Sequence, residues 1–126
     1  MDKHLQFLNH SSYIISSPKA KILCDPWFKG TAFSDGWSLL YDNSHNINEL
    51  DFNCIWISHE HPDHFSIPTL RELNKNCTFL FQETKDKKVK EYLEDKGHFV
   101  IELKNKQETI VGDLKVTSIV LSLIHI

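Results

Sequence analysis

Short hydrophobic runs and two amphipathic segments predict a layered fold of strands and helices. Helical spacing of apolar residues, three or four apart, predicts helices over 67–76 and 85–96. Strands are predicted by the shorter apolar runs, and a Gly-Asp pair inside the last of them predicts a hairpin. The runs cover 5–7, 13–15, 21–24, 52–58, 78–81, 99–103 and 109–120. This order of elements indicates an α/β (α+β layered) sheet with helices covering one face.

Local signals mark the ends of both predicted helices. Ser66 is a suitable N-cap with Pro68 in the first turn, and Thr84 is the N-cap predicted for the second helix. Gly97 is predicted to end that helix. Residues 26–51 form a long irregular segment whose aromatic residues predict a packed loop.

Composition indicates one globular domain spanning residues 1–126. The chain is 40% hydrophobic and 25% charged, which is ordinary for a folded domain. Its net charge of -3 and its single arginine, Arg71, argue against nucleic acid as a partner. The longest apolar run is far shorter than the ~18 residues that predict a membrane span. Without a secretory start or a disulfide pattern among Cys24, Cys54 and Cys77, we expect a cytoplasmic protein.

One segment, residues 58–65, carries most of the candidate chemistry. His59, His61 and His64 fall within six positions, with Asp63 among them, between a buried strand and a capped helix. His59 and His61 are two residues apart, so in extended backbone both imidazoles can point to one side. Imidazole and carboxylate groups are ligands for zinc, iron or manganese. The pattern therefore predicts a metal site at the carboxyl end of a strand.

The same motif carries a resemblance to a known family. His59-x-His61-x-Asp63-His64 after an apolar strand resembles the signature of the metallo-β-lactamase-fold hydrolases. Residues 10–15 and 21–27 resemble the opening of the branch with ascorbate-6-phosphate lactonase and N-acyl-phosphatidylethanolamine phospholipase D. Residues 25–28 and 36–40 look closer to the lactamase-like part of CMP-N-acetylneuraminate hydroxylase-type proteins.

The resemblance implies a four-layer αββα sandwich, of which this chain would be the N-terminal half. It implies two divalent metals, most simply zinc, with His59 and His61 on one and Asp63 and His64 on the other. Asp63 would also be the catalytic proton acceptor for a metal-bound hydroxide that attacks an ester, lactone or phosphodiester in a small-molecule substrate. Asp25 would orient a ligating histidine, and His10 would line the mouth of the site.

The family's remaining ligands belong to a second half that these residues do not include. Residues 121–126 resemble translated sequencing adapter, so we expect the natural chain to differ there. A half sandwich would expose a sheet face meant for the missing half, so the isolated chain is expected to aggregate or dimerise.

Two other functions stay open from the sequence. One is an iron-dependent enzyme of the CMP-sialic-acid hydroxylase type, or one that modifies sugar nucleotides or polysaccharides. The other is a non-catalytic metal-binding half domain. The sequence leaves the substrate and the choice among zinc, iron and manganese undecided, because histidine and carboxylate ligands suit all three metals.

Overall fold

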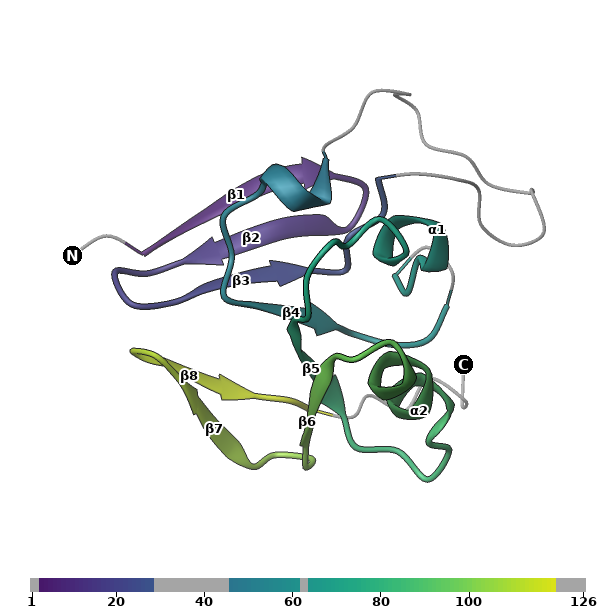
Figure 1. Ribbon diagram of the computed structural model, residues 1–126. Helices are drawn as coiled ribbons and strands as arrows, with labels where there is room; N and C mark the ends of the chain where they lie inside the picture. Colours follow the sequence, from purple (N-terminus) through teal and green to yellow (C-terminus); the bar gives the residue numbers. More distant parts are fainter. Residues whose placement is uncertain (1–2, 29–45, 62–63, 120–126) are drawn as a thin grey trace.

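A six-stranded mixed sheet forms the centre of the protein (Figure 1). The computed structural model describes residues 3–28, 46–61 and 64–119. The first three strands pair antiparallel, and the next three join them in parallel. In sheet order they are β1 His4–Asn9, β2 Ser12–Ser16, β3 Lys21–Cys24, β4 Cys54–Ile57, β5 Thr78–Gln82 and β6 Phe99–Leu103. All six agree with the strands predicted from the apolar runs.

The helices cover one face of this sheet and form the larger core with it. They are the short 3-10 helix η1 Ile47–Glu49 and the α-helices α1 Ile67–Leu70 and α2 Lys88–Asp95. Strand residues Leu23, Ile55, Ile57 and Phe79 are completely buried beneath them. Leu93 of α2 joins the same core, which confirms the apolar face predicted for this helix.

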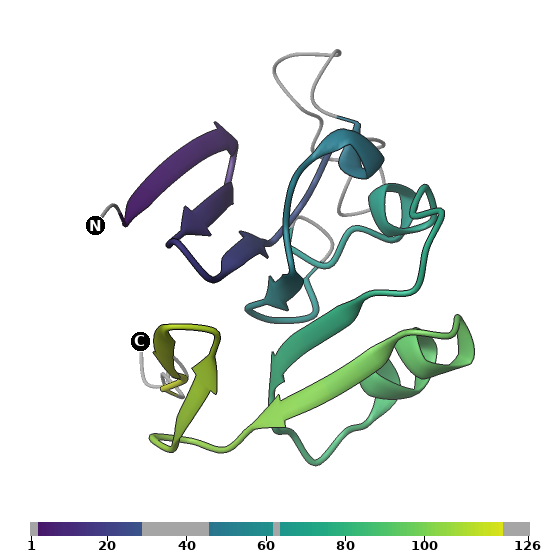
Figure 2. The same cartoon turned by 60° about the vertical axis from the view of Figure 1, so that its left-hand side comes forward.

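A hairpin packs on the opposite face (Figure 2). It consists of β7 Glu108–Val111 and β8 Leu114–Thr117, paired antiparallel. Val111, Leu114 and Val116 pack against a second cluster that includes Ile22 and Leu80 of the sheet. The sheet is therefore the middle of three layers, as expected for part of a layered sandwich. No helix within the described ranges is long and apolar enough to span a membrane.

Both predicted helices are shorter in the structure than the sequence indicated. Helix α1 ends at Leu70 rather than near residue 76. The amide NH of Asn74 and the carbonyl of Glu72 bond instead to the side chain of Asn48, at 3.0 and 2.6 Å. A side chain 24 and 26 residues away in sequence thus competes with the helix for these backbone groups, and helical periodicity does not reveal it.

Helix α2 begins three residues later than predicted, and Thr84 is not its N-cap. Thr84 donates its hydroxyl hydrogen to the carbonyl of Asp86 in a turn, 2.5 Å away. The Asp86 carboxylate accepts from the NH of Lys88 at 2.9 Å, so this turn uses the polar groups that a cap would supply. Gly97, with φ of +92°, follows the helix end as predicted.

Only the ends of the irregular segment 26–51 can be described. Trp27 and Phe28 are buried, in line with the packed loop that the aromatics predict. Residues 29–45, with Trp37, lie outside the described residues, as do 62–63 and 120–126. The predicted adapter-like end, 121–126, therefore stays a prediction.

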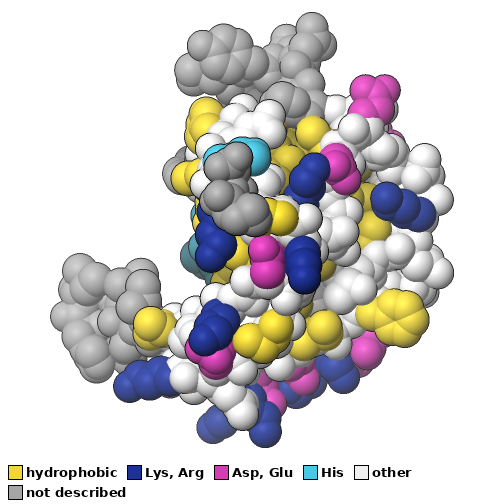
Figure 3. Space-filling model, turned by 90° about the vertical axis from the view of Figure 1, so that its left-hand side faces the viewer, with side chains coloured by type: hydrophobic (Ala, Val, Ile, Leu, Met, Phe, Trp, Pro, Cys, Tyr) yellow, Lys and Arg dark blue, Asp and Glu magenta, His cyan; other side chains and the backbone are white. Residues whose placement is uncertain are grey.

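Apolar side chains remain exposed on the hairpin side of the sheet. Cross-strand register puts Leu5 and Phe7 of β1 on the same face as Phe99 and Ile101 of β6. Phe7 and Phe99 are 68% and 70% exposed, because the hairpin covers only the middle of the face. Figure 3, which faces the left-hand side of Figure 1, shows hydrophobic side chains at the surface between charged ones.

This exposure predicts that the 126-residue chain self-associates when it is expressed alone. Phe7→Lys and Phe99→Lys should shift it toward monomer, because a charge on an apolar contact must be desolvated. Gln6→Lys, on the other face of β1, is the matched control. Multi-angle light scattering gives the mass. A wild-type chain that stays monomeric at high concentration would contradict the prediction.

The hairpin depends on Gly112, which has a φ of +60° at its tip. A Cβ there would lie 2.6 Å from the carbonyl oxygen of Lys19 and 2.9 Å from the Cβ of Ala20. The Asp113 carboxylate beside it accepts a hydrogen bond from Ser17, which holds the pKa of that carboxyl below its usual range. The hairpin tip thus sits directly on the β2–β3 turn.

Gly112→Ala is expected to lower the free energy of unfolding by about 1–3 kcal/mol, from left-handed backbone strain and this close approach. Urea unfolding of the full-length protein would measure the change. Lys115→Ala, an exposed position on the same hairpin, should change stability little. Equal effects of the two substitutions would show that the tip contact does not matter.

Candidate metal centre

The candidate site lies where β3 and β4 end. These strands are parallel neighbours, so their carboxyl ends share one edge of the sheet. Asp25 follows β3 and Ser58 follows β4, while the histidine segment continues from Ser58. Asp25 lies in the left-handed region, with φ of 43°, and its NH bonds to the carbonyl of Trp56 at 2.9 Å. Parallel strand pairing thus brings two distant segments together.

The buried carboxylate of Asp25 holds the start of the histidine segment. One of its oxygens, Oδ1, accepts the backbone NH of Ser58 at 2.7 Å. The other, Oδ2, accepts the Ser58 hydroxyl at 2.7 Å and lies 2.9 Å from Nδ1 of His64. Asp25 itself is 4% exposed, so its carboxylate is shielded from bulk water, which strengthens these part-buried bonds.

Ser58 extends this network to a second histidine. Its Oγ lies 2.8 Å from Nδ1 of His59. Because the Ser58 hydroxyl hydrogen goes to Asp25, the Oγ accepts from His59, which assigns a proton to Nδ1 of that ring. The Asp25 carboxylate can only accept a hydrogen bond, so Nδ1 of His64, 2.9 Å from Oδ2, carries a proton as well. The sequence reasoning did not single out Ser58, and its only signal was a hydroxyl directly before the motif.

The three histidine rings of the motif gather next to this network. The ring centroid of His59 lies 4.6 Å from that of His61 and 4.0 Å from that of His64. Backbone bonds from the NH groups of His64 and Phe65 to the carbonyl of His61, at 2.9 and 2.7 Å, close the loop. Buried Phe65 anchors it against Tyr92.

Not every predicted site residue is placed. Asp63 lies outside the described residues. His10 is exposed, and its ring centroid lies 4.9 Å from that of Trp27 in a T-shaped pair and 6.2 Å from that of His64. It therefore lies beside the histidine cluster, and its place at the mouth of a site stays a prediction. Within the described part of the chain, no group of three or more His, Cys, Asp or Glu side chains is placed to bind one metal ion.

Cys24, next to Asp25, is excluded as a reactive thiolate in this structure. It is 1% exposed, and burial raises the pKa of its thiol to about 12. Burial likewise raises the pKa of Cys54 to about 11. Both thiols are therefore protonated at neutral pH and serve as small core residues.

A cleft of about 920 Å³ opens beside the histidines. His59 and His61 line it together with Trp56 from β4 and Phe81 from β5. The β5–α2 turn contributes Lys85, and further lining comes from residues 58, 60, 82–84, 86, 89, 118 and 119. Its size suits a small molecule, and it lies at the strand ends where α/β folds bind ligands.

Comparison with known proteins agrees with this fold. A family model described as the Beta-lactamase superfamily domain matches residues 4–120. Cytidine monophosphate-N-acetylneuraminic acid hydroxylase of Danio rerio is 33% identical over 73 residues, which are 56% of this chain and 12% of that protein. The chain thus spans about an eighth of this relative's length.

Two solved structures have similar folds. The CmlA beta-hydroxylase E377D mutant matches with a TM-score of 0.69 at 15% identity, over 97% of this chain and 25% of that chain. A protein of Veillonella parvula DSM 2008, described as a possible metal-dependent hydrolase, matches with a TM-score of 0.62 at 13% identity. That match covers 88% of this chain and 45% of the other. Each match covers less than half of the solved relative. This chain belongs to the beta-lactamase superfamily and has the metallo-β-lactamase-type fold, a hydrolase-type fold.

Proposed function

We propose that the full-length protein is a metal-dependent hydrolase that cleaves an ester, lactone or phosphodiester in a small molecule. The observation that carries this proposal is the Asp25 network, which orients His59 and His64 beside a ligand-sized cleft. A buried carboxylate that fixes the Nδ1 side of imidazoles is the usual support for metal-binding histidines.

The residues present fit a divalent metal. In the proposed site, protons on Nδ1 of His59 and His64 make Nε2 the nitrogen that would bind metal. His59 and His61 would hold one ion, and Asp63 with His64 would serve the second. Zinc is the simplest choice, and iron or manganese also suits these ligands. A metal in this position would supply an activated water at neutral pH.

The chain's own residues would do three things in this reaction. Asp25 and Ser58 would keep the imidazoles oriented. A carboxylate oxygen of Asp63 would take the proton from the attacking water and later donate it to the leaving group. The cleft would bind the substrate against Trp56 and Phe81, and the remainder of the fold would complete the site.

A second candidate function is oxidative hydroxylation with iron. It is favoured by the names of two similar proteins, which are both hydroxylases. In that case the protein would modify a sugar nucleotide or polysaccharide and would consume dioxygen with an electron donor.

Metal content and reaction type distinguish the two functions in the full-length protein. For a hydrolase we expect zinc or manganese by plasma mass spectrometry, with turnover of a lactone, p-nitrophenyl acetate or bis(p-nitrophenyl) phosphate. Dialysis against a chelator should abolish the turnover, and metal should restore it. Bound iron with substrate-dependent oxygen uptake, and no turnover of the three hydrolase probes, would replace the first proposal with the second.

Ser58→Ala is expected to lower the metal affinity of the full-length protein about tenfold, because His59 loses the acceptor for its Nδ1 proton. Ser58→Thr keeps the hydroxyl and should restore most of the affinity. Ser17→Ala removes a buried serine at the distant hairpin contact and is the matched control. Competition with a chromophoric chelator measures the affinity. Unchanged affinity in Ser58→Ala would show that the hydroxyl does not support the site.

A further inference from the structure

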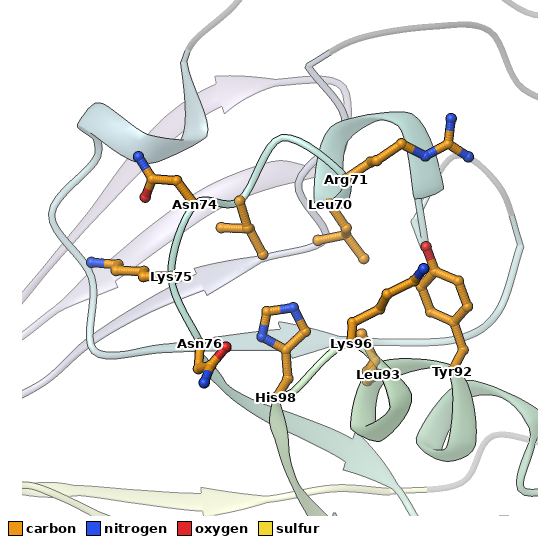
Figure 4. A pocket seen from close by; sticks show the side chains of 10 residues that line it. Leu70, Arg71, Asn74, Lys75, Asn76, Tyr92, Leu93, Lys96 and His98 are labelled. Carbon is orange, nitrogen blue, oxygen red and sulfur yellow. The ribbon is translucent and has the colours of Figure 1, made fainter.

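A second pocket lies on the helical side of the protein and shares no lining residue with the histidine cleft (Figure 4). Its volume is about 330 Å³. Helix α1, the connection to β5, helix α2 and the residue before β6 each contribute to its wall. The lining residues are Leu70, Arg71, Leu73, Asn74, Lys75, Asn76, Tyr92, Leu93, Lys96 and His98.

The charged side chains of this pocket all have the same sign. Arg71, Lys75 and Lys96 surround it, and among the described residues no aspartate or glutamate lines it. The protein as a whole carries a net charge of -3, so this cluster runs against the overall charge. None of the three cations forms an ion pair with a carboxylate of the described residues. Such a cluster lowers the energy of an anion at the pocket mouth.

His98 adds a fixed neutral donor to the cations. Its Nδ1 accepts the backbone NH of Cys77 at 2.9 Å, so the ring proton is on Nε2. Burial lowers the pKa of His98, which keeps the ring neutral at neutral pH. Figure 4 shows the ring projecting into the middle of the pocket, with the Lys96 side chain beside Tyr92 and with the charged ends of Arg71 and Lys75 directed outward at opposite sides.

The inner wall of the pocket is apolar. Leu70 and Leu93 are 4% and 0% exposed, and both belong to the core cluster between the helices and the sheet. The ring of Tyr92 forms one side and carries the Lys96 ammonium 5.6 Å from its centroid. A ligand that fits must therefore combine a small apolar part with an anionic end.

We propose that this pocket binds a small organic anion, with its oxyanion group between Lys96 and His98 and its apolar part against Leu70 and Leu93. The Arg71 side chain, which points outward from the rim in Figure 4, would turn inward to meet the oxyanion. The guanidinium of Arg71 can pair with two oxygens at once, whereas the lysine supplies a point charge. The proposal does not rest on the hydrolase activity, because the pocket is separate from the histidine cleft.

Phenylphosphonate is a suitable probe, because it has both parts and no hydrolysable ester. The full-length protein with 15N-labelled histidine would be titrated and the His98 ring signals followed. We expect a saturable shift, with the affinity about fivefold weaker in Arg71→Gln and in Lys96→Gln. Lys88→Gln, an exposed lysine on the same helix, is the matched control and should bind as the wild type does.

Two further ligands test the two parts separately. Inorganic phosphate lacks the apolar part and benzyl alcohol lacks the charge, so both should bind at least about tenfold more weakly. The proposal is wrong if His98 shows no saturable shift. It is also wrong if inorganic phosphate binds as tightly as phenylphosphonate, or if Lys88→Gln weakens binding as much as the pocket variants do.

Discussion

Asp25→Ala is expected to lower the metal affinity of the full-length protein by about 10- to 100-fold. The substitution removes the acceptor for Nδ1 of His64 and for the Ser58 hydroxyl, so two imidazoles lose their orientation together. It also leaves the backbone NH of Ser58 without its 2.7 Å acceptor in a part-buried position. Isothermal titration of the metal-free protein with zinc measures the affinity directly.

Two variants separate this effect from general loss of stability. Asp25→Asn keeps the shape and one carbonyl acceptor but cannot accept all three bonds, so its affinity should lie between those of wild type and Asp25→Ala. Asp51→Ala removes an exposed carboxylate that pairs with Lys21 and should leave the affinity unchanged. If Asp25→Ala stays folded and binds zinc as tightly as wild type, the network does not orient metal ligands.

Asp63→Asn is expected to lower the turnover of the full-length protein by about 10²–10⁴-fold while the fold survives. The amide keeps the size of the side chain but cannot take the proton from the attacking water. Steady-state kinetics would measure the loss, and circular dichroism would follow the thermal unfolding midpoint. Asp95→Asn, an exposed change at the end of α2, controls for the loss of one negative charge.

The same variant tests the third function left open by the sequence. A non-catalytic metal-binding domain would show lower metal affinity in Asp63→Asn and no other functional loss. Full turnover in Asp63→Asn, with metal still bound, would remove Asp63 from the proposed chemistry.

The strands were predictable from local patterns because each is a short apolar run between turn residues. The helix ends were not predictable from such patterns, because they depend on polar contacts, with the distant Asn48 for α1 and within the preceding turn for α2. Asn48 takes backbone groups that would have extended α1, and the Thr84–Asp86 turn delays α2. Apolar spacing therefore identified both helices and the buried face of α2, while their lengths followed from polar contacts.

The candidate site, like the helices, was predictable where it depends on neighbouring residues and not where it depends on distant ones. The histidine motif lies within one loop, so its proximity to a strand end was readable from the sequence. Asp25 was expected beside a ligating histidine only through a resemblance, and its contact with His64 joins residues 39 positions apart. Ser58 was not predicted, because the sequence does not show that its hydroxyl bonds to Asp25 and His59. The roles of His59, His61, Asp63 and His64 as metal ligands stay predictions.

The sequence by itself determined the order of strands and helices, the family and a cluster of histidines at the end of a strand. The tertiary structure decided which side chains meet. Parallel pairing of β3 with β4 sets Asp25 against Ser58 and His64, and the packing of α1 and α2 gathers Arg71, Lys96 and His98 around one pocket. Local patterns reflect burial and backbone preference, whereas a site between distant segments depends on strand register and helix packing.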